Sequence, residues 1–140
     1  MTSHLSAIGR LGTGFTVDEN GVISVTGGSG GGITWNEVTG TSQTAAADNG
    51  YIANNSSLVT ITLPATCALG KTIRVAGFGA GGWAVAQNVG QQIIYGDVTT
   101  TEGVSGSLAS INRYDAVELL CVVADTKFIV ISGIGTVEVA

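Results

Sequence analysis

Five carboxylates in the second half of the chain could act as acid and base groups in the hydrolysis of a glycoside. That reaction needs one carboxyl group as general acid and a second as nucleophile or base, about 5 Å or about 6.5–9.5 Å away. The sequence does not give these separations. We therefore rank a glycan-degrading enzyme behind the two hypotheses given at the end of this section. The five residues are Asp97, Glu102, Asp115, Glu118 and Asp125.

Two of these carboxylates lie close to an arginine in the sequence. Arg113 and Asp115 are two positions apart, so an extended backbone would place both side chains on one face, with Glu118 close behind. We favour a structural ion pair at a subunit interface, formed by Arg113, Asp115 and Glu118, over catalysis.

Aromatic and amide side chains could form a carbohydrate site, in which a ring stacks on the sugar and amides bind its hydroxyl groups. The candidate set is Trp83, Gln87, Asn88 and Tyr95. In the alternative interpretation, which we favour, the aromatic residues belong to the core or an interface and the amides line turns. The wider set includes Trp35, Tyr51, Tyr114, Asn54, Asn55, Gln91 and Gln92.

Other catalytic and cofactor chemistry lacks the residues it needs. The single histidine is His4, so neither a Ser-His-Asp triad nor a metal site with Cys67 and Cys121 can be assembled. Residues 77–82 match the spacing of a dinucleotide-binding turn, but residues 83–87 alternate as a strand where that motif requires a helix. We predict no catalytic residue, no cofactor and no metal, and two buried, reduced cysteines.

The composition indicates self-association. Among the 140 residues, 44% are hydrophobic and 11% are charged, whereas charged residues make up about 25% of an ordinary soluble domain. No hydrophobic run approaches the ~20 residues of a membrane helix, so we expect the spare apolar surface to be buried between subunits.

The net charge of −5 argues against a nucleic-acid partner. The N-terminal residues lack a signal-peptide pattern, which predicts a protein made in the cytoplasm.

Glycine divides the chain into two parts. Residues 27–32 contain five glycines and one serine and predict a flexible linker. Before the linker, two alternating runs flank Asn20-Gly21, a strong hairpin signal. Such a hairpin is marginal alone, so we predict that residues 1–26 are an attachment arm that docks on a partner. Its anchoring residues would be Phe15, Val17, Val22, Ile23 and Val25.

After the linker, short alternating runs separated by turn residues predict a head domain over residues 33–140. Turn signals recur every 8–12 residues, as in a sandwich or barrel, and no window keeps a helical period. We predict an all-β fold, an antiparallel β-sandwich or barrel-like domain. The expected strands are 33–38, 50–53, 58–63, 71–76, 83–87, 92–95, 116–123, 127–131 and 136–139.

Residues 35–140 also resemble a small β domain that recurs in virion proteins of bacteriophages and prophages, often at the ends of tail fibres. The resemblance rests on the order and spacing of several segments, and it implies an intertwined homotrimer on the outside of a virion. It brings no catalytic residues. The segments are 38–44, 49–55, 59–64, 81–83, 86–88 and 107–121.

The chain lacks the long repetitive shaft of a tail fibre, so the resemblance favours a short fibre or capsid decoration protein on the virion surface. Its partners would be two further copies of itself and a capsid or tail protein bound by the arm, with no membrane partner. The alternative hypothesis is a lectin-like fibre tip that binds a host-surface glycan.

Overall fold

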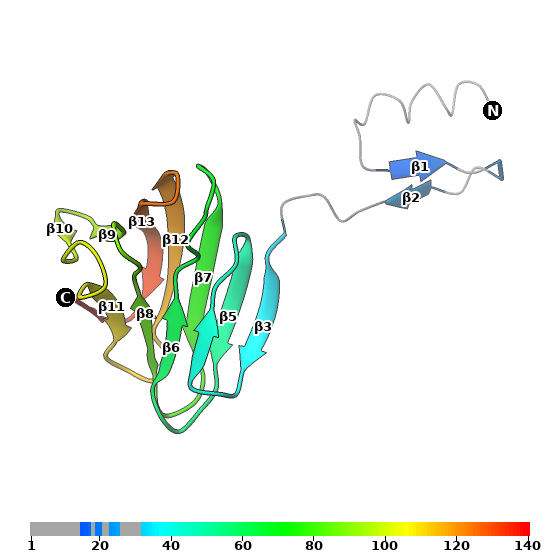
Figure 1. Ribbon diagram of the computed structural model, residues 1–140. Coiled ribbons are helices and arrows are strands. Elements are labelled where there is room, and N and C mark those ends of the chain that lie inside the picture. Colours follow the sequence, from blue (N-terminus) through cyan, green and yellow to red (C-terminus); the bar gives the residue numbers. More distant parts are fainter. Residues whose placement is uncertain (1–14, 18, 21–22, 26–31) are drawn as a thin grey trace. The chain divides into compact units, whose positions relative to one another are not determined.

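The computed structural model divides the chain into two compact units, residues 1–32 and 33–140 (Figure 1). In the first unit, β1 (Phe15–Val17) pairs antiparallel with β2 (Ile23–Val25), as the sequence predicts. Of the predicted anchoring residues, Val22 lies outside the described part of the chain. The function of this hairpin as an attachment arm stays a prediction. The structure describes residues 15–17, 19–20, 23–25 and 32–140.

The second unit consists of two mixed β-sheets packed as a sandwich, and the described residues contain no helix. The all-β prediction is therefore confirmed. The seven-stranded sheet has the order β10 (Val98–Thr99), β9 (Gln92–Tyr95), β13 (Lys127–Ile134), β12 (Ala116–Val123), β7 (Thr72–Gly77), β5 (Asn49–Ala53) and β3 (Thr34–Val38). The five-stranded sheet has the order β14 (Val137–Val139), β11 (Ser107–Ser110), β8 (Trp83–Ala86), β6 (Val59–Thr62) and β4 (Ser42–Thr44).

The first six strands of the sandwich alternate between the sheets, which makes neighbours within each sheet parallel. Strands β3, β5 and β7 lie side by side in one sheet, and β4, β6 and β8 lie side by side in the other. Each strand in one sheet is followed along the chain by a strand in the other sheet, so the backbone winds around the core in successive turns. The prediction of an antiparallel sheet is wrong for this half, because a turn signal does not say whether the next strand stays in the same sheet.

The second half of the unit adds mostly antiparallel pairs. Strand β12 pairs antiparallel with both β7 and β13, and β11 pairs antiparallel with both β8 and β14. Strand β9 is the exception, because it runs parallel to β13. These strands extend both sheets.

Alternating side chains from both sheets fill the core. Val117, Leu119 and Cys121 of β12 point inward, and Val59 and Ile61 of β6 face them from the other sheet. The largest fully buried side chains are those of Trp83 and Phe128. Apolar surface removed from water contributes about 25 cal/mol per Å², so the burial of these side chains is the main source of stability of the unit.

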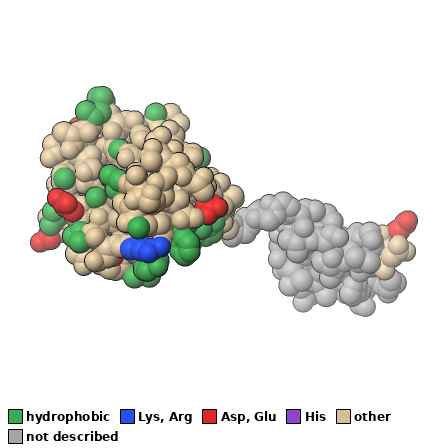
Figure 2. Space-filling model, turned by 90° about the horizontal axis from the view of Figure 1, so that it is seen from below, with side chains coloured by type: hydrophobic (Ala, Val, Ile, Leu, Met, Phe, Trp, Pro, Cys, Tyr) green, Lys and Arg blue, Asp and Glu red, His purple; other side chains and the backbone are tan. Residues whose placement is uncertain are grey.

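Three loops meet at one end of the sandwich, the lower end in Figure 1. They follow β5, β7 and β11, and they span residues 54–58, 78–82 and 111–115. Val38, the last residue of β3, pairs with Ala53 on β5, which in turn pairs with Gly77 on β7. The ends of these three strands therefore lie together, and this end of the sandwich is opposite the start of β3. Figure 2 views the molecule from this side.

The part of the chain that the structure describes has no helix long and apolar enough to cross a membrane.

Candidate functional site

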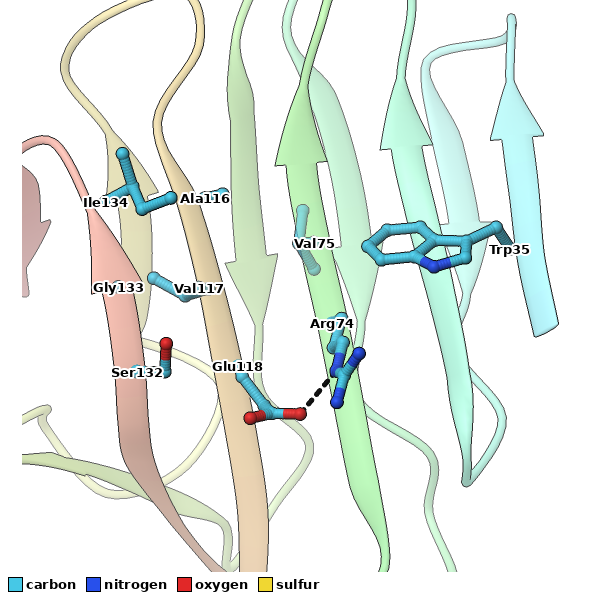
Figure 3. Close-up of a pocket in the computed structure, with 9 residues that line it drawn as sticks. All are labelled: Trp35, Arg74, Val75, Ala116, Val117, Glu118, Ser132, Gly133 and Ile134. Carbon is cyan, nitrogen blue, oxygen red and sulfur yellow. Dashed lines mark hydrogen bonds and ion pairs between the residues drawn. The ribbon is translucent and has the colours of Figure 1, made fainter. Parts of the chain in front are cut away.

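A cavity of about 330 Å³ opens on the outer face of the seven-stranded sheet (Figure 3). It lies between Trp35 on β3 and the last residues of β13, across β7 and β12. Its position on a sheet face, between residues that are distant in sequence, explains why no local motif predicted it. The lining residues are Trp35, Arg74, Val75, Ala116, Val117, Glu118, Ser132, Gly133 and Ile134.

Trp35 forms one wall of the cavity, and its indole packs across the neighbouring strand. A Cβ atom at Gly50, the register partner of Trp35 on β5, would lie 2.6 Å from the ring. Only glycine at position 50 therefore allows the indole to lie flat over β5, where it remains 46% exposed. Figure 3 shows the indole pointing across the sheet toward β7.

An ion pair crosses the floor of the cavity. Arg74 on β7 and Glu118 on β12 are register partners, and the Nε of Arg74 donates to a carboxylate oxygen of Glu118. Because the pair is partly exposed, it contributes modestly to stability, but it supplies a hydrogen-bond donor and acceptor side by side. Glu118 is the single carboxylate among the lining residues. The site can thus bind polar and apolar groups, but its lining lacks the second carboxylate of a glycosidase.

Trp83 does not form a sugar-stacking surface. Its side chain is 0% exposed, and its Nε1 donates a hydrogen bond of 2.8 Å to the backbone carbonyl of Asp115. The core interpretation of Trp83 is confirmed, and the glycan-binding hypothesis is wrong for this residue. Alternation along β8 explains this, because Trp83 and Val85 both face the interior.

Gln87 is also buried, and its amide holds a loop together. Its Nε2 donates to the carbonyl oxygens of Gln91 at 2.8 Å, Thr101 at 2.9 Å and Gly103 at 2.8 Å. The hydroxyl of Thr100 donates to its Oε1. Gln87 therefore has no free group for a sugar, and the glycan-binding hypothesis is wrong for it too.

The other two residues of that set keep some exposure but belong to different surroundings. The Nδ2 of Asn88 donates to the carbonyl of Leu63 at 2.8 Å, so this half-buried amide braces a turn. Tyr95 is exposed at the end of β9. The four residues do not form one exposed site.

The predicted ion pair of Arg113, Asp115 and Glu118 does not form within the chain. Glu118 pairs with Arg74, whereas the buried Asp115 accepts hydrogen bonds from the backbone nitrogens of Ile111 at 2.9 Å and Asn112 at 2.7 Å. Arg113 and Asp115 lie in the loop before β12, so strand alternation does not align their side chains.

Cys67 and Cys121 are both buried, as predicted, and lie close together. The thiol of Cys121 donates to the carbonyl oxygen of Cys67 at 3.3 Å. Burial, followed by the neighbouring Cys121, raises the pKa of Cys67 to about 12. This thiol therefore stays protonated at neutral pH and is a poor nucleophile or metal ligand. Among the described residues, no group of three or more His, Cys, Asp or Glu side chains is arranged to hold a metal ion.

The remaining carboxylates do not gather into a catalytic pair around the cavity. Asp97, Glu102 and Asp125 are exposed on separate loops or turns, and one oxygen of Asp125 accepts a hydrogen bond of 2.7 Å from the backbone nitrogen of Cys67. Comparison with models of protein families and with curated proteins finds no match to the sequence.

Proposed function

We propose that the protein is a structural component of the outer surface of a bacteriophage virion, a short fibre or a capsid decoration protein. In this proposal three copies associate through their head domains, and residues 1–26 anchor each copy to a capsid or tail protein. The virion location rests on the resemblance of residues 35–140 to phage β domains. The association rests on the surface of the sandwich.

The observation that carries the association is an uncovered apolar face on the seven-stranded sheet. Ile94, Ile129 and Leu120 are register partners across β9, β13 and β12, and they alternate with residues that face the core. On β13, Ile131 and Ile134 are 50% and 72% exposed. Exposed apolar side chains gathered on one sheet face in this way are typical of an interaction site.

The outer face of the five-stranded sheet differs in character. Its central positions are Thr60, Thr62, Ala84 and Ala86, which pair across β6 and β8 and are small or polar. Burial of that face would remove much less apolar surface from water. We therefore assign the subunit interface to the seven-stranded sheet and its cavity, where the Arg74–Glu118 pair supplies polar contacts.

Light scattering on the purified chain tests the association. We expect a particle of three times the 14.0 kDa chain mass for the wild type, and monomers for Ile131→Glu and Ile134→Glu, because a charge buried in an apolar contact is costly. Thr60→Glu, on the other sheet, is the matched control and should remain a trimer. A monomeric wild type would refute the trimer, and trimeric Ile131→Glu and Ile134→Glu variants would refute the assigned face.

Deletion of residues 1–26 tests the anchor. The shortened chain should remain a trimer in solution but no longer incorporate into virions, since the arm makes the attachment. Normal incorporation of the shortened chain would contradict the arm assignment, while leaving the interface unaffected.

A further inference from the structure

We propose that the three loops at the end of the sandwich opposite the start of β3 bind an acidic sugar, a pyranose unit that carries a carboxylate. Arg113 binds the carboxylate, and the rings of Tyr114 and Phe78 contact the sugar ring. This goes beyond the proposed function and does not depend on it, since the site is formed by loop residues of a single chain, next to the end of the assigned interface at Ala116 and Ile134.

Arg113 has a positive charge that is held in position and not neutralised. Its Nε donates to the carbonyl of Phe78 at 2.9 Å, and its guanidinium carbon lies 5.2 Å from the centre of the Tyr114 ring. No carboxylate pairs with it among the residues that the structure describes, whereas Arg74 pairs with Glu118. The terminal nitrogens of a guanidinium form a fork that fits the two oxygens of a carboxylate.

Two exposed aromatic rings lie beside this charge. The centres of Phe78 and Tyr114 are 6.4 Å apart and their planes are inclined by 55°. The two residues come from different loops, and they are 54% and 60% exposed. A pyranose offers C–H groups to such rings and hydroxyl groups to neighbouring polar groups, here the exposed Asn112. Figure 2, which views this end, shows basic atoms bordered by hydrophobic side chains.

Buried contacts hold the loops in place before any ligand binds. Asp115 accepts hydrogen bonds from two backbone nitrogens of its own loop, and its carbonyl accepts one from Trp83. At Gly79 and Gly81 the second loop packs so closely against the first that a Cβ atom would overlap the backbone of Asn55 and Ser57. A site that is already ordered loses less conformational entropy on binding.

The charge balance favours a carboxylate over a phosphate. The chain has a net charge of −5, and a phosphate monoester carries about −1.5 to −2 at pH 7. Lys71 and Lys127 lie at the opposite end of the sandwich, before β7 and at the start of β13. One guanidinium therefore matches the single charge of a carboxylate.

Isothermal titration of the full chain with two matched pairs of probes tests the ligand class. We expect tri-galacturonate to bind, and its methyl ester, which keeps the rings and removes the charge, to bind about tenfold more weakly or not at all. Galactose 6-phosphate should bind more weakly than galacturonate. Equal binding of the ester, stronger binding of the phosphate, or no binding of tri-galacturonate would each overturn the proposal.

Variants test the assigned residues. Arg113→Gln and Tyr114→Ala should each weaken tri-galacturonate binding about tenfold or more, with an unchanged melting temperature, because both side chains are exposed. Arg113→Lys should recover only part of the affinity, since it restores the charge without the fork. Lys127→Gln and Tyr95→Ala are the matched controls and should bind like the wild type. Full affinity in Arg113→Gln, or equal losses in the controls, would contradict the site.

Discussion

The indole nitrogen of Trp83 donates a hydrogen bond of 2.8 Å to the backbone carbonyl of Asp115 in the interior of the sandwich. Trp83 begins β8 in the five-stranded sheet, and Asp115 directly precedes β12 in the seven-stranded sheet. One side chain thus links the two sheets and fixes the loop that carries Arg113 and Tyr114. The residue that the sequence suggested as a sugar platform instead supports a neighbouring loop.

Substitution of Trp83 should separate its packing from its hydrogen bond. We expect Trp83→Ala to lower the free energy of unfolding by about 3–5 kcal/mol, because it leaves a cavity. Trp83→Phe keeps an aromatic ring but removes the indole donor. The Asp115 carbonyl keeps its hydrogen bond of 3.0 Å from the backbone nitrogen of Gly77, so the loss should be about 0.5–1.5 kcal/mol. Urea denaturation followed by circular dichroism measures both values. A Trp83→Ala variant as stable as the wild type would show that the indole is not part of the core.

Asp115→Ala should loosen the loop of residues 111–115 more than the rest of the fold. The substitution leaves the backbone nitrogen of Asn112 without its acceptor and that of Ile111 with only the carbonyl of Thr136, at 3.2 Å, and should cost about 1–3 kcal/mol. Hydrogen exchange should be faster at these two amides than in the wild type. Asp97→Ala, at an exposed turn, is the control and should leave exchange unchanged. Exchange at Ile111 and Asn112 that stayed slow in Asp115→Ala would show that the carboxylate is dispensable.

Gln87→Leu tests the buried amide that binds three carbonyl groups. Leucine has a similar size but no donor, so the carbonyls of Gln91, Thr101 and Gly103 lose their hydrogen bonds from the amide. The carbonyls of Gln91 and Gly103 keep those from the backbone nitrogens of Gly103 and Gly106. We expect a loss of about 2–4 kcal/mol in stability, measured as a lower urea midpoint. Gln43→Leu, at an exposed position on β4, should change the midpoint little. Similar midpoints for the two variants would indicate that the Gln87 network contributes nothing specific.

Alkaline pH should destabilise the fold in part through Cys67. Its pKa is raised from 9.0 to about 12 in the folded state, so above pH 9 the unfolded chain loses this proton first. The corresponding stability is fully present below pH 9 and is lost as the pH rises toward 12. In Cys67→Ala the free energy of unfolding should fall less steeply between pH 9 and pH 11. Identical slopes in the wild type and the variant would mean that folding does not raise the pKa of the Cys67 thiol.

Local sequence patterns were sufficient to predict the all-β class and the positions of most strands. The pair Asn20-Gly21 predicted the hairpin of β1 and β2 because a tight turn depends on its own two residues. Alternation placed Ile61 in a strand because the two-residue period of a strand needs no knowledge of its neighbours. The usual burial of aromatic residues favoured a core or interface position for Trp83, and the structure shows it in the core.

Which strands become neighbours was decided only by the tertiary structure. Arg74 and Glu118 are 44 residues apart in sequence and form an ion pair because β7 and β12 adjoin in one register, and no local pattern specifies that register. The cavity beside Trp35 and the contact of Arg113 with Tyr114 and Phe78 likewise combine separate segments. A sequence pattern determines how each segment folds, whereas burial of apolar surface by the whole chain determines which segments meet.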